Sequence, residues 1–207
     1  MAIKVANNNS LASITALPSG VSGGAMNLIS TQTASSSSTL SFTSNIDDTY
    51  DEYVFKFYDI HAATDTAIFS FQGNASGGSG YNETITSSYF EAYHQENDAD
   101  TSLTYNTSGD QAQGTGFQSL SQQGLGVGTG ENDMCLVGSL HLYAPSDTTF
   151  ITHFISSINY NDKSASVYSN NTFVAGYFNL TGAIDEIQFK MSTGNIDAGV
   201  IKLYGIS

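Results

Sequence analysis

The sequence predicts an all-β protein, an antiparallel β-sandwich of jelly-roll type that follows an extended N-terminal arm. Short segments rich in Val, Ile, Thr, Tyr and Phe alternate with Gly, Asn, Asp and Ser along most of the chain. No segment keeps an apolar stripe at helical spacing over three turns. Only 2 of the 207 residues are proline. Many short, evenly spaced strands with few prolines are typical of a sandwich of this type.

Ten strands are expected after the arm, and each shows period-two alternation of apolar and polar residues. Their ranges are 26–33, 38–44, 52–60, 66–73, 82–93, 134–143, 149–159, 172–178, 184–192 and 199–205. The alternation is clearest where Phe55 and Phe57 are interleaved with Lys56 and Tyr58. One side of each strand should therefore face a core, and the other side should face solvent or a partner.

Two of these strands carry more specific expectations. In the range 149–159 both sides are largely apolar, so we expect this strand to be buried on both sides by a second sheet or another subunit. Near the C-terminal end, residues 192–195 supply a turn that tolerates positive φ. The strands on either side of that turn are expected to form a closing hairpin.

The chain divides into a predicted arm and hinge, residues 1–25, and a predicted sandwich domain, residues 26–207. The first range is small and polar, with Pro18 followed by three glycines, which is typical of an extended segment and a hinge. A frayed terminus is the alternative. The polar or Gly-rich ranges 94–116 and 121–133 are expected to be long loops that form contact surfaces.

The charge of the chain disfavours several classes of partner. Lys and Arg total 5 against 19 Asp and Glu, a net charge of −14, and none of the five is arginine. Nucleic acid is not an expected partner, because its phosphates need clustered Lys and Arg. No apolar run approaches the roughly 20 residues of a membrane span, and no continuous apolar signal segment is recognisable. A single cysteine, Cys135, cannot form an internal disulfide.

No constellation of residues predicts an enzyme, so no catalytic, cofactor-binding or metal-binding residue is assigned. A G-x-S-x-G elbow, the usual mark of one class of serine hydrolase, is absent. Adjacent carboxylates, such as Asp47 and Asp48, would point to opposite faces of a strand, which does not suit a glycosidase. His141 and His153 lie in neighbouring predicted strands and could form a metal pair. Ordinary strand histidines are the favoured interpretation.

Acidic residues in two predicted loops, 96–100 and 131–133, are candidates for a calcium site, because calcium prefers oxygen ligands. An EF-hand does not fit, since Ser102 stands where that loop requires glycine. The favoured interpretation is that these are solvated loop acids.

Four stretches resemble small β-rich virion structural proteins of marine tailed bacteriophages. They are LISTQTASSSSTLSFTS at 28–44, YDEYVFKFYDIHAATD at 50–65, GSLHLYAPSDTTFITHF at 138–154 and IDEIQFKMSTGNIDAGVIKLYGIS at 184–207. The resemblance implies a non-enzymatic virion protein that is tail- or fibre-associated or decorates the capsid. It also implies a homo-oligomer, a trimer, whose arm attaches it to a tail protein or the major capsid protein.

Scarcity of lysine also favours assembly. Sandwich edges need protection, often by Lys, and five lysines serve about ten strands, so neighbouring subunits or loops are expected to cover the edges. The alternative function is a carbohydrate-binding module for host-surface adhesion, in which Tyr93, Tyr105 or Tyr143 would stack on a glycan because the chain has no Trp. A third candidate, an esterase or glycosidase, has no motif to support it.

Overall fold

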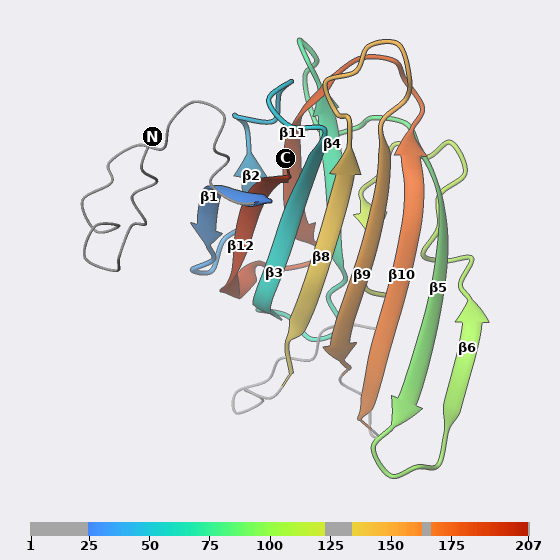
Figure 1. Ribbon diagram of the computed structural model, residues 1–207. Coiled ribbons are helices and arrows are strands. Elements are labelled where there is room, and N and C mark those ends of the chain that lie inside the picture. Colours follow the sequence, from blue (N-terminus) through green and yellow to red (C-terminus); the bar gives the residue numbers. More distant parts are fainter. Residues whose placement is uncertain (1–24, 123–133, 163–166, 207) are drawn as a thin grey trace, which may run out of the picture.

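A computed structural model describes residues 25–122, 134–162 and 167–206, and these residues form strands and connecting segments without a helix (Figure 1). The strands are β1 Met26–Thr33, β2 Leu40–Phe42, β3 Glu52–Ala62, β4 Phe69–Ala75, β5 Ile85–Gln95, β6 Thr101–Tyr105, β7 Gln118–Ser119, β8 Leu136–Tyr143, β9 His153–Asn161, β10 Tyr168–Phe178, β11 Ile184–Met191 and β12 Ile196–Ile206. The prediction of an all-β protein is therefore confirmed for this part of the chain. The predicted arm, apart from its last residue, lies outside the described residues.

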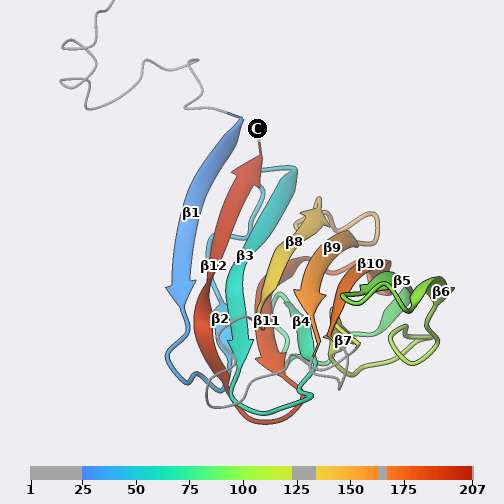
Figure 2. The ribbon, with the colours of Figure 1, turned by 90° about the horizontal axis from the view of Figure 1, so that it is seen from below.

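Two antiparallel sheets of unequal width make up the fold. The large sheet has eight strands in the order β1-β12-β3-β8-β9-β10-β5-β6, and the small sheet has four in the order β2-β11-β4-β7. Figure 2 shows the two layers, with the small sheet covering one face of the large one. Phe71 of β4 and Phe154 of β9 have ring centroids 5.0 Å apart across this interface. The sheets thus pack face to face, as in a β-sandwich.

All ten predicted strands are present, with ends that shift by a few residues. Strands β6 and β7 were not predicted. The first lies in the polar range 94–116, and its side chains are mostly exposed, so it lacks the alternation that marks a half-buried strand. The second has only two residues, which is too short for a periodic signal.

Phenylalanine side chains form the centre of the core. Phe189 of β11 contacts five other rings, and its ring centroid lies 5.3 Å from those of both Phe55 and Phe57. All three side chains are almost fully buried, whereas Tyr58 on the opposite side of β3 is 40% exposed. The alternation predicted for this strand is therefore confirmed, and its inward residues join the two sheets.

The expectation that the strand at 149–159 is buried on both sides is wrong for the single chain. In β9 the residues alternate, with Phe154 and Ile158 buried and His153 and Ile155 exposed. The apolar residues at 150 and 151 precede the strand and belong to a connecting segment. Only the inner side of β9 faces the small sheet, because the opposite side of the large sheet has no second layer among the described residues.

The predicted closing hairpin is also wrong. Strand β11 pairs with β2 and β4, whereas β12 pairs with β1 and β3, so the two strands belong to different sheets. Gly194 does have a positive φ of 68°, as the sequence indicates. The turn therefore carries the chain from one layer to the other, and a local sequence signal cannot distinguish this crossing from a hairpin.

Residues 109–120, of which 109–116 belong to a predicted contact loop, lie against the inner face of the large sheet. Gln118 donates a hydrogen bond from Nε2 to the carbonyl oxygen of Gly109 (2.7 Å) and accepts one at Oε1 from Ser87 Oγ (2.6 Å). Thr172 Oγ1 donates to the carbonyl oxygen of Leu120 (2.8 Å). Gln118 belongs to β7 of the small sheet, so its buried amide joins the two sheets next to β5. Thr172 of β10 connects the large sheet to the segment that follows β7.

Replacing Phe189 with alanine should destabilise the fold by about 3–5 kcal/mol, because the cavity would lie at the centre of the core. Urea unfolding followed by circular dichroism measures the change. The matched control is Phe150→Ala, since Phe150 is 71% exposed and surface changes usually stay within about 0.5 kcal/mol. Equal losses in the two variants would contradict the proposed centre of the core.

Candidate functional site

The outer face of the large sheet, the side turned away from the small sheet, gathers most of the exposed apolar side chains. This face is turned toward the viewer in Figure 1. Among the described residues, eight of the nine exposed large apolar side chains belong to strands of this sheet. They are Met26, Leu28, Tyr58, Phe90, Leu103, Tyr105, Val137 and Ile155. Single exposed apolar residues are ordinary on a protein surface, whereas a contiguous group of them is typical of an interaction surface.

One end of this face carries the β5–β6 patch, which we define as Phe90, Leu103, Tyr105 and Phe173. The rings of Phe90 and Phe173 are stacked with centroids 5.0 Å apart, and Phe90 pairs with Tyr105 across the strands. Leu103 is 73% exposed. Tyr105 donates a hydrogen bond to Asp110 (2.5 Å), and this bond raises the pKa of the phenol. The patch therefore combines apolar area with an ordered phenol.

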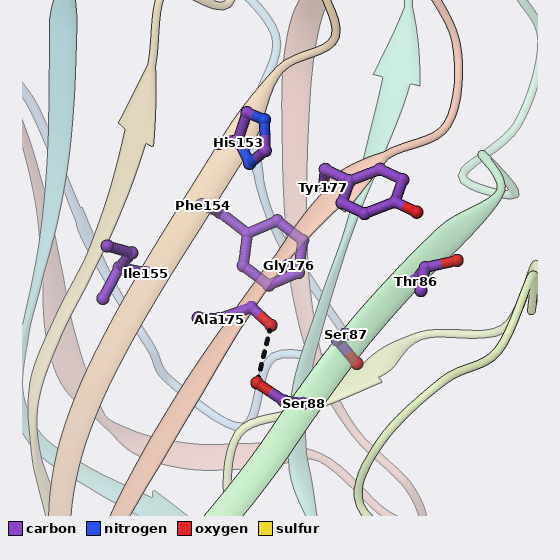
Figure 3. A pocket seen from close by; sticks show the side chains of 9 residues that line it. All are labelled: Thr86, Ser87, Ser88, His153, Phe154, Ile155, Ala175, Gly176 and Tyr177. Atoms are coloured by element: carbon purple, nitrogen blue, oxygen red, sulfur yellow. Dashed lines mark hydrogen bonds between the residues drawn. The ribbon is translucent and has the colours of Figure 1, made fainter.

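A shallow hollow of about 510 Å³ lies on the same face over β9, β10 and β5 (Figure 3). Its lining includes Thr86, His153, Ile155 and Tyr177. The rings of His153 and Tyr177 have centroids 5.7 Å apart. Tyr143 of β8 pairs with His153, which pairs with Tyr177. The three side chains therefore form an aromatic row along one edge of the hollow, one ring on each of three adjacent strands.

Beside this row, three side chains form a hydrogen-bonded chain. His141 Nδ1 lies 2.6 Å from Glu52 Oε1, and His141 Nε2 lies 3.2 Å from Ser139 Oγ. A carboxylate oxygen only accepts hydrogen bonds, so Nδ1 carries the proton. When the ring is neutral, Nε2 therefore has a free electron pair that can accept the hydrogen of the Ser139 hydroxyl. This arrangement is a serine, histidine and glutamate connected in series.

Strand register brings these three side chains together. Ser139 and His141 are two residues apart on β8, so both face outward, while the intervening Leu140 is buried in the core. Glu52 comes from β3, where it pairs with Tyr143. Burial of the inner side of β8 thus holds the outward side chains on a rigid strand.

An irregularity in the ladder adjoins Ser139. Gly138 has a φ of 151°, and a Cβ at this position would collide with the carbonyl oxygen of Ser157. The pairing of β3 with β8 shifts register just beyond it, between Phe57 and Ile60. Glycine therefore allows the close approach of β8 to β9 that fixes the position of Ser139.

The histidines and tyrosines that the sequence offered as candidates lie in different parts of the structure. His141 and His153 lie in neighbouring strands, as expected, but His141 pairs with Ile155, so the two histidines are not opposite each other. Tyr143 belongs to the aromatic row, where partial burial, followed by the charge of Glu52, raises the pKa of its phenol. Tyr93 packs against Tyr168 at 5.5 Å instead, and Tyr105 lies in the β5–β6 patch.

In the described residues, the acidic loop candidates bring no cluster of three such side chains together. No group of three or more His, Cys, Asp or Glu side chains in the described ranges could hold a metal ion. Within the range 96–100, Asp98 shares a hydrogen bond with His94 Nε2 (3.1 Å), and Asn97 caps the nitrogen of Ala99. The range 131–133 lies outside the described residues.

Sequence reasoning missed the Glu52, His141 and Ser139 chain. The spacing of Ser139 and His141 on a predicted strand was a usable signal, because residues two apart share a face. The acid could not be found in this way, since Glu52 is 89 positions from His141 in the sequence and only strand order makes β3 and β8 neighbours.

Comparisons with protein-family models, with curated proteins and with solved structures gave no match to this chain. In the described residues there is no helix long and apolar enough to cross a membrane.

Replacing Gly138 with alanine should cost about 1–3 kcal/mol of unfolding free energy, because the new Cβ meets backbone in a conformation that L residues rarely adopt. Chemical denaturation measures the change. Gly116→Ala is the matched control, since nothing lies within 4 Å of the point that its new Cβ would occupy, and its effect should stay within about 0.5 kcal/mol. Indistinguishable midpoints for the two variants would contradict the close approach of β8 and β9.

Proposed function

We propose that this chain is a structural protein of a bacteriophage virion, tail- or fibre-associated or capsid-decorating, whose subunits associate through the outer face of the large sheet. The observation that carries the proposal is the exposed β5–β6 patch at the free edge of that sheet. The sequence resemblance supplies the virion location and the trimeric order.

The edge strand β6 supports association. Its sequence, TSLTY, contains no charged residue and no proline, the two features that most often block pairing at an edge. Strand β6 pairs only with β5 among the described residues. An edge that is uncharged and bordered by Leu103 and Tyr105 is a template for a second chain, so a neighbouring subunit covers it in the assembly.

The centre of the same face differs in charge from the chain as a whole. Outward positions of the large sheet include Lys56 and Lys202, which pair with each other across β3 and β12, and the acid Glu52. The chain as a whole has a net charge of −14. At these positions two lysines stand beside one acid, so this part of the face does not share the net negative charge of the chain.

The sandwich is a jelly roll with two inserted strand pairs under this proposal. Eight jelly-roll strands, numbered along the chain, form sheets in the orders 1-8-3-6 and 2-7-4-5. Strands β1, β2, β3, β4, β7, β8, β11 and β12 reproduce both orders. The remaining pairs, β5 with β6 and β9 with β10, extend the large sheet beyond β8 and supply the β5–β6 patch.

The arm is the proposed attachment to the particle. Residues 1–25 precede β1, the strand at the opposite edge of the large sheet from β6. Twenty-five extended residues can span tens of Å, so the arm can bind a tail protein or the major capsid protein while the patch binds another subunit.

Removing residues 1–25 should abolish incorporation into particles; undiminished incorporation would contradict this attachment.

Replacing Leu103 with lysine should shift the purified protein from an oligomer toward a single subunit, because the new charge would be buried at the subunit contact. Sedimentation velocity at micromolar concentration measures the mass. Phe150→Lys is the matched control, since Phe150 is also exposed but lies outside the patch, and it should leave the mass unchanged. A wild-type protein that is monomeric at these concentrations would overturn the proposed association.

Carbohydrate binding is the second candidate function, and the aromatic row supports it. Tyr143, His153 and Tyr177 each present a ring on one of three adjacent strands, and adjacent strands lie about 4.8 Å apart. The hollow beside them also offers the hydroxyl of Thr86. Aromatic rings flanked by hydrogen-bonding groups are the usual means of holding a sugar.

Replacing Tyr177 with alanine should weaken glycan binding about tenfold, since an aromatic contact contributes roughly 1 kcal/mol. A glycan array followed by titration calorimetry with the best binder measures the affinity. Tyr105→Ala, which changes the β5–β6 patch instead, should bind as the wild type does. An array without signal above background would remove this function.

A further inference from the structure

We propose that Ser139 is a hydrolytic nucleophile, activated by His141, that removes a short acyl group from an ester. The inference goes beyond the structural role above and does not depend on it. It rests on the Glu52, His141 and Ser139 chain, which has the composition and order of a nucleophile, a general base and an acid that orients the base.

The distances between Ser139, His141 and Glu52 fall in the range at which a nucleophile, a base and an orienting acid work together. Ser139 Oγ and His141 Nε2 are 3.2 Å apart, which is the upper end of hydrogen-bond reach for a base and its nucleophile before substrate binds. His141 Nδ1 donates to Glu52 over 2.6 Å, a short, charge-assisted bond. Glu52 thereby fixes the ring so that its unprotonated nitrogen faces the serine.

The site is open to a substrate but held rigidly. The side chains of His141 and Glu52 are 34% and 27% exposed, so a molecule on the outer face can reach them. The residues on the opposite side of β8, Leu140 and Leu142, are fully buried. The catalytic side chains therefore project from a strand that the core immobilises, which preserves their geometry.

Cations are in register with the serine. Lys56 of β3 pairs with Ser139, and Lys202 of β12 pairs with Lys56. Directly opposite residues have Cβ atoms about 4.5–5.5 Å apart, so the flexible side chain of Lys56 can reach the carbonyl oxygen of an ester bound at Ser139. Its ammonium would then stabilise the negative charge that develops on that oxygen.

The reaction balances with water as the only co-reactant. Ser139 Oγ attacks the acyl carbon while its proton moves to His141 Nε2, and the bond from the acyl carbon to the alcohol oxygen breaks as that oxygen takes the proton. Water then attacks the acyl group on Ser139 and gives a proton to Nε2. The bond to Oγ breaks, the proton returns to Oγ, and a carboxylic acid is released.

The shape of the outer face defines the class of substrate. Ser139 lies within a sheet face rather than in a deep pocket, so the ester must be displayed on the surface of a larger molecule. A short acyl group on a polysaccharide hydroxyl meets this requirement, since it needs no enclosed binding site for a long chain.

The test is covalent labelling of the full-length protein with a fluorophosphonate probe, followed by peptide mass spectrometry. We expect the label on Ser139. Labelling should fall by at least about 100-fold in His141→Gln, which removes the base. The matched control is Ser157→Ala, because Ser157 pairs with Ser139 on the same face, and this variant should label as the wild type does.

Hydrolysis of 4-nitrophenyl acetate gives a second readout. Ser139→Ala should lose all turnover above the buffer rate while keeping the wild-type melting temperature. Glu52 is a positioning residue, so Glu52→Gln should lower kcat with an unchanged KM.

Absence of label on folded wild-type protein, or labelling of Ser139 that His141→Gln leaves intact, would overturn the proposal. Loss of oligomerisation in Leu103→Lys with labelling retained would separate this activity from the assembly role.

Discussion

Burial of phenylalanine between two sheets of unequal width is the constraint on which the rest of the structure depends. Phe189 and its neighbours join β2, β4 and β11 of the small sheet to β3 of the large one. Toward β5 and β10 hydrogen bonds also join the layers, from Ser87 to Gln118 of β7 and from Thr172 to the carbonyl oxygen of Leu120. Among the described residues, no second layer covers the outer face of the large sheet.

The uncovered outer face explains why three different features lie close together. The β5–β6 patch, the aromatic row and the Glu52, His141 and Ser139 chain all use outward residues of strands whose inward residues form the core. Period-two alternation gives each strand one structural side and one free side. The proposed subunit contact at the β6 edge would leave the central strands β3, β8 and β9 accessible, so the two proposals for this face are compatible.

Alternation made most of the strands predictable, as Phe55 and Phe57 illustrate, because it follows from the geometry of a single strand. Strand β6 could not be found, since all but one of its side chains are exposed at an edge and it has no buried side to mark. The start of β9 was predicted too early, because Phe150 is apolar but lies exposed in the segment before the strand. Local pattern reports burial only where a second layer exists, and the sequence does not say where that layer ends.

By itself the sequence determined an all-β chain, the positions of ten strands and a positive φ at Gly194, since these depend on neighbours along the chain. Only the tertiary structure decided which strands are adjacent. It separated β11 from β12, placed His141 opposite Ile155 rather than His153, and brought Glu52 to His141 across 89 positions. Strand order depends on how the two layers bury their shared core. The free energy of that burial comes from contacts between residues that are distant in sequence, so no local pattern reports it.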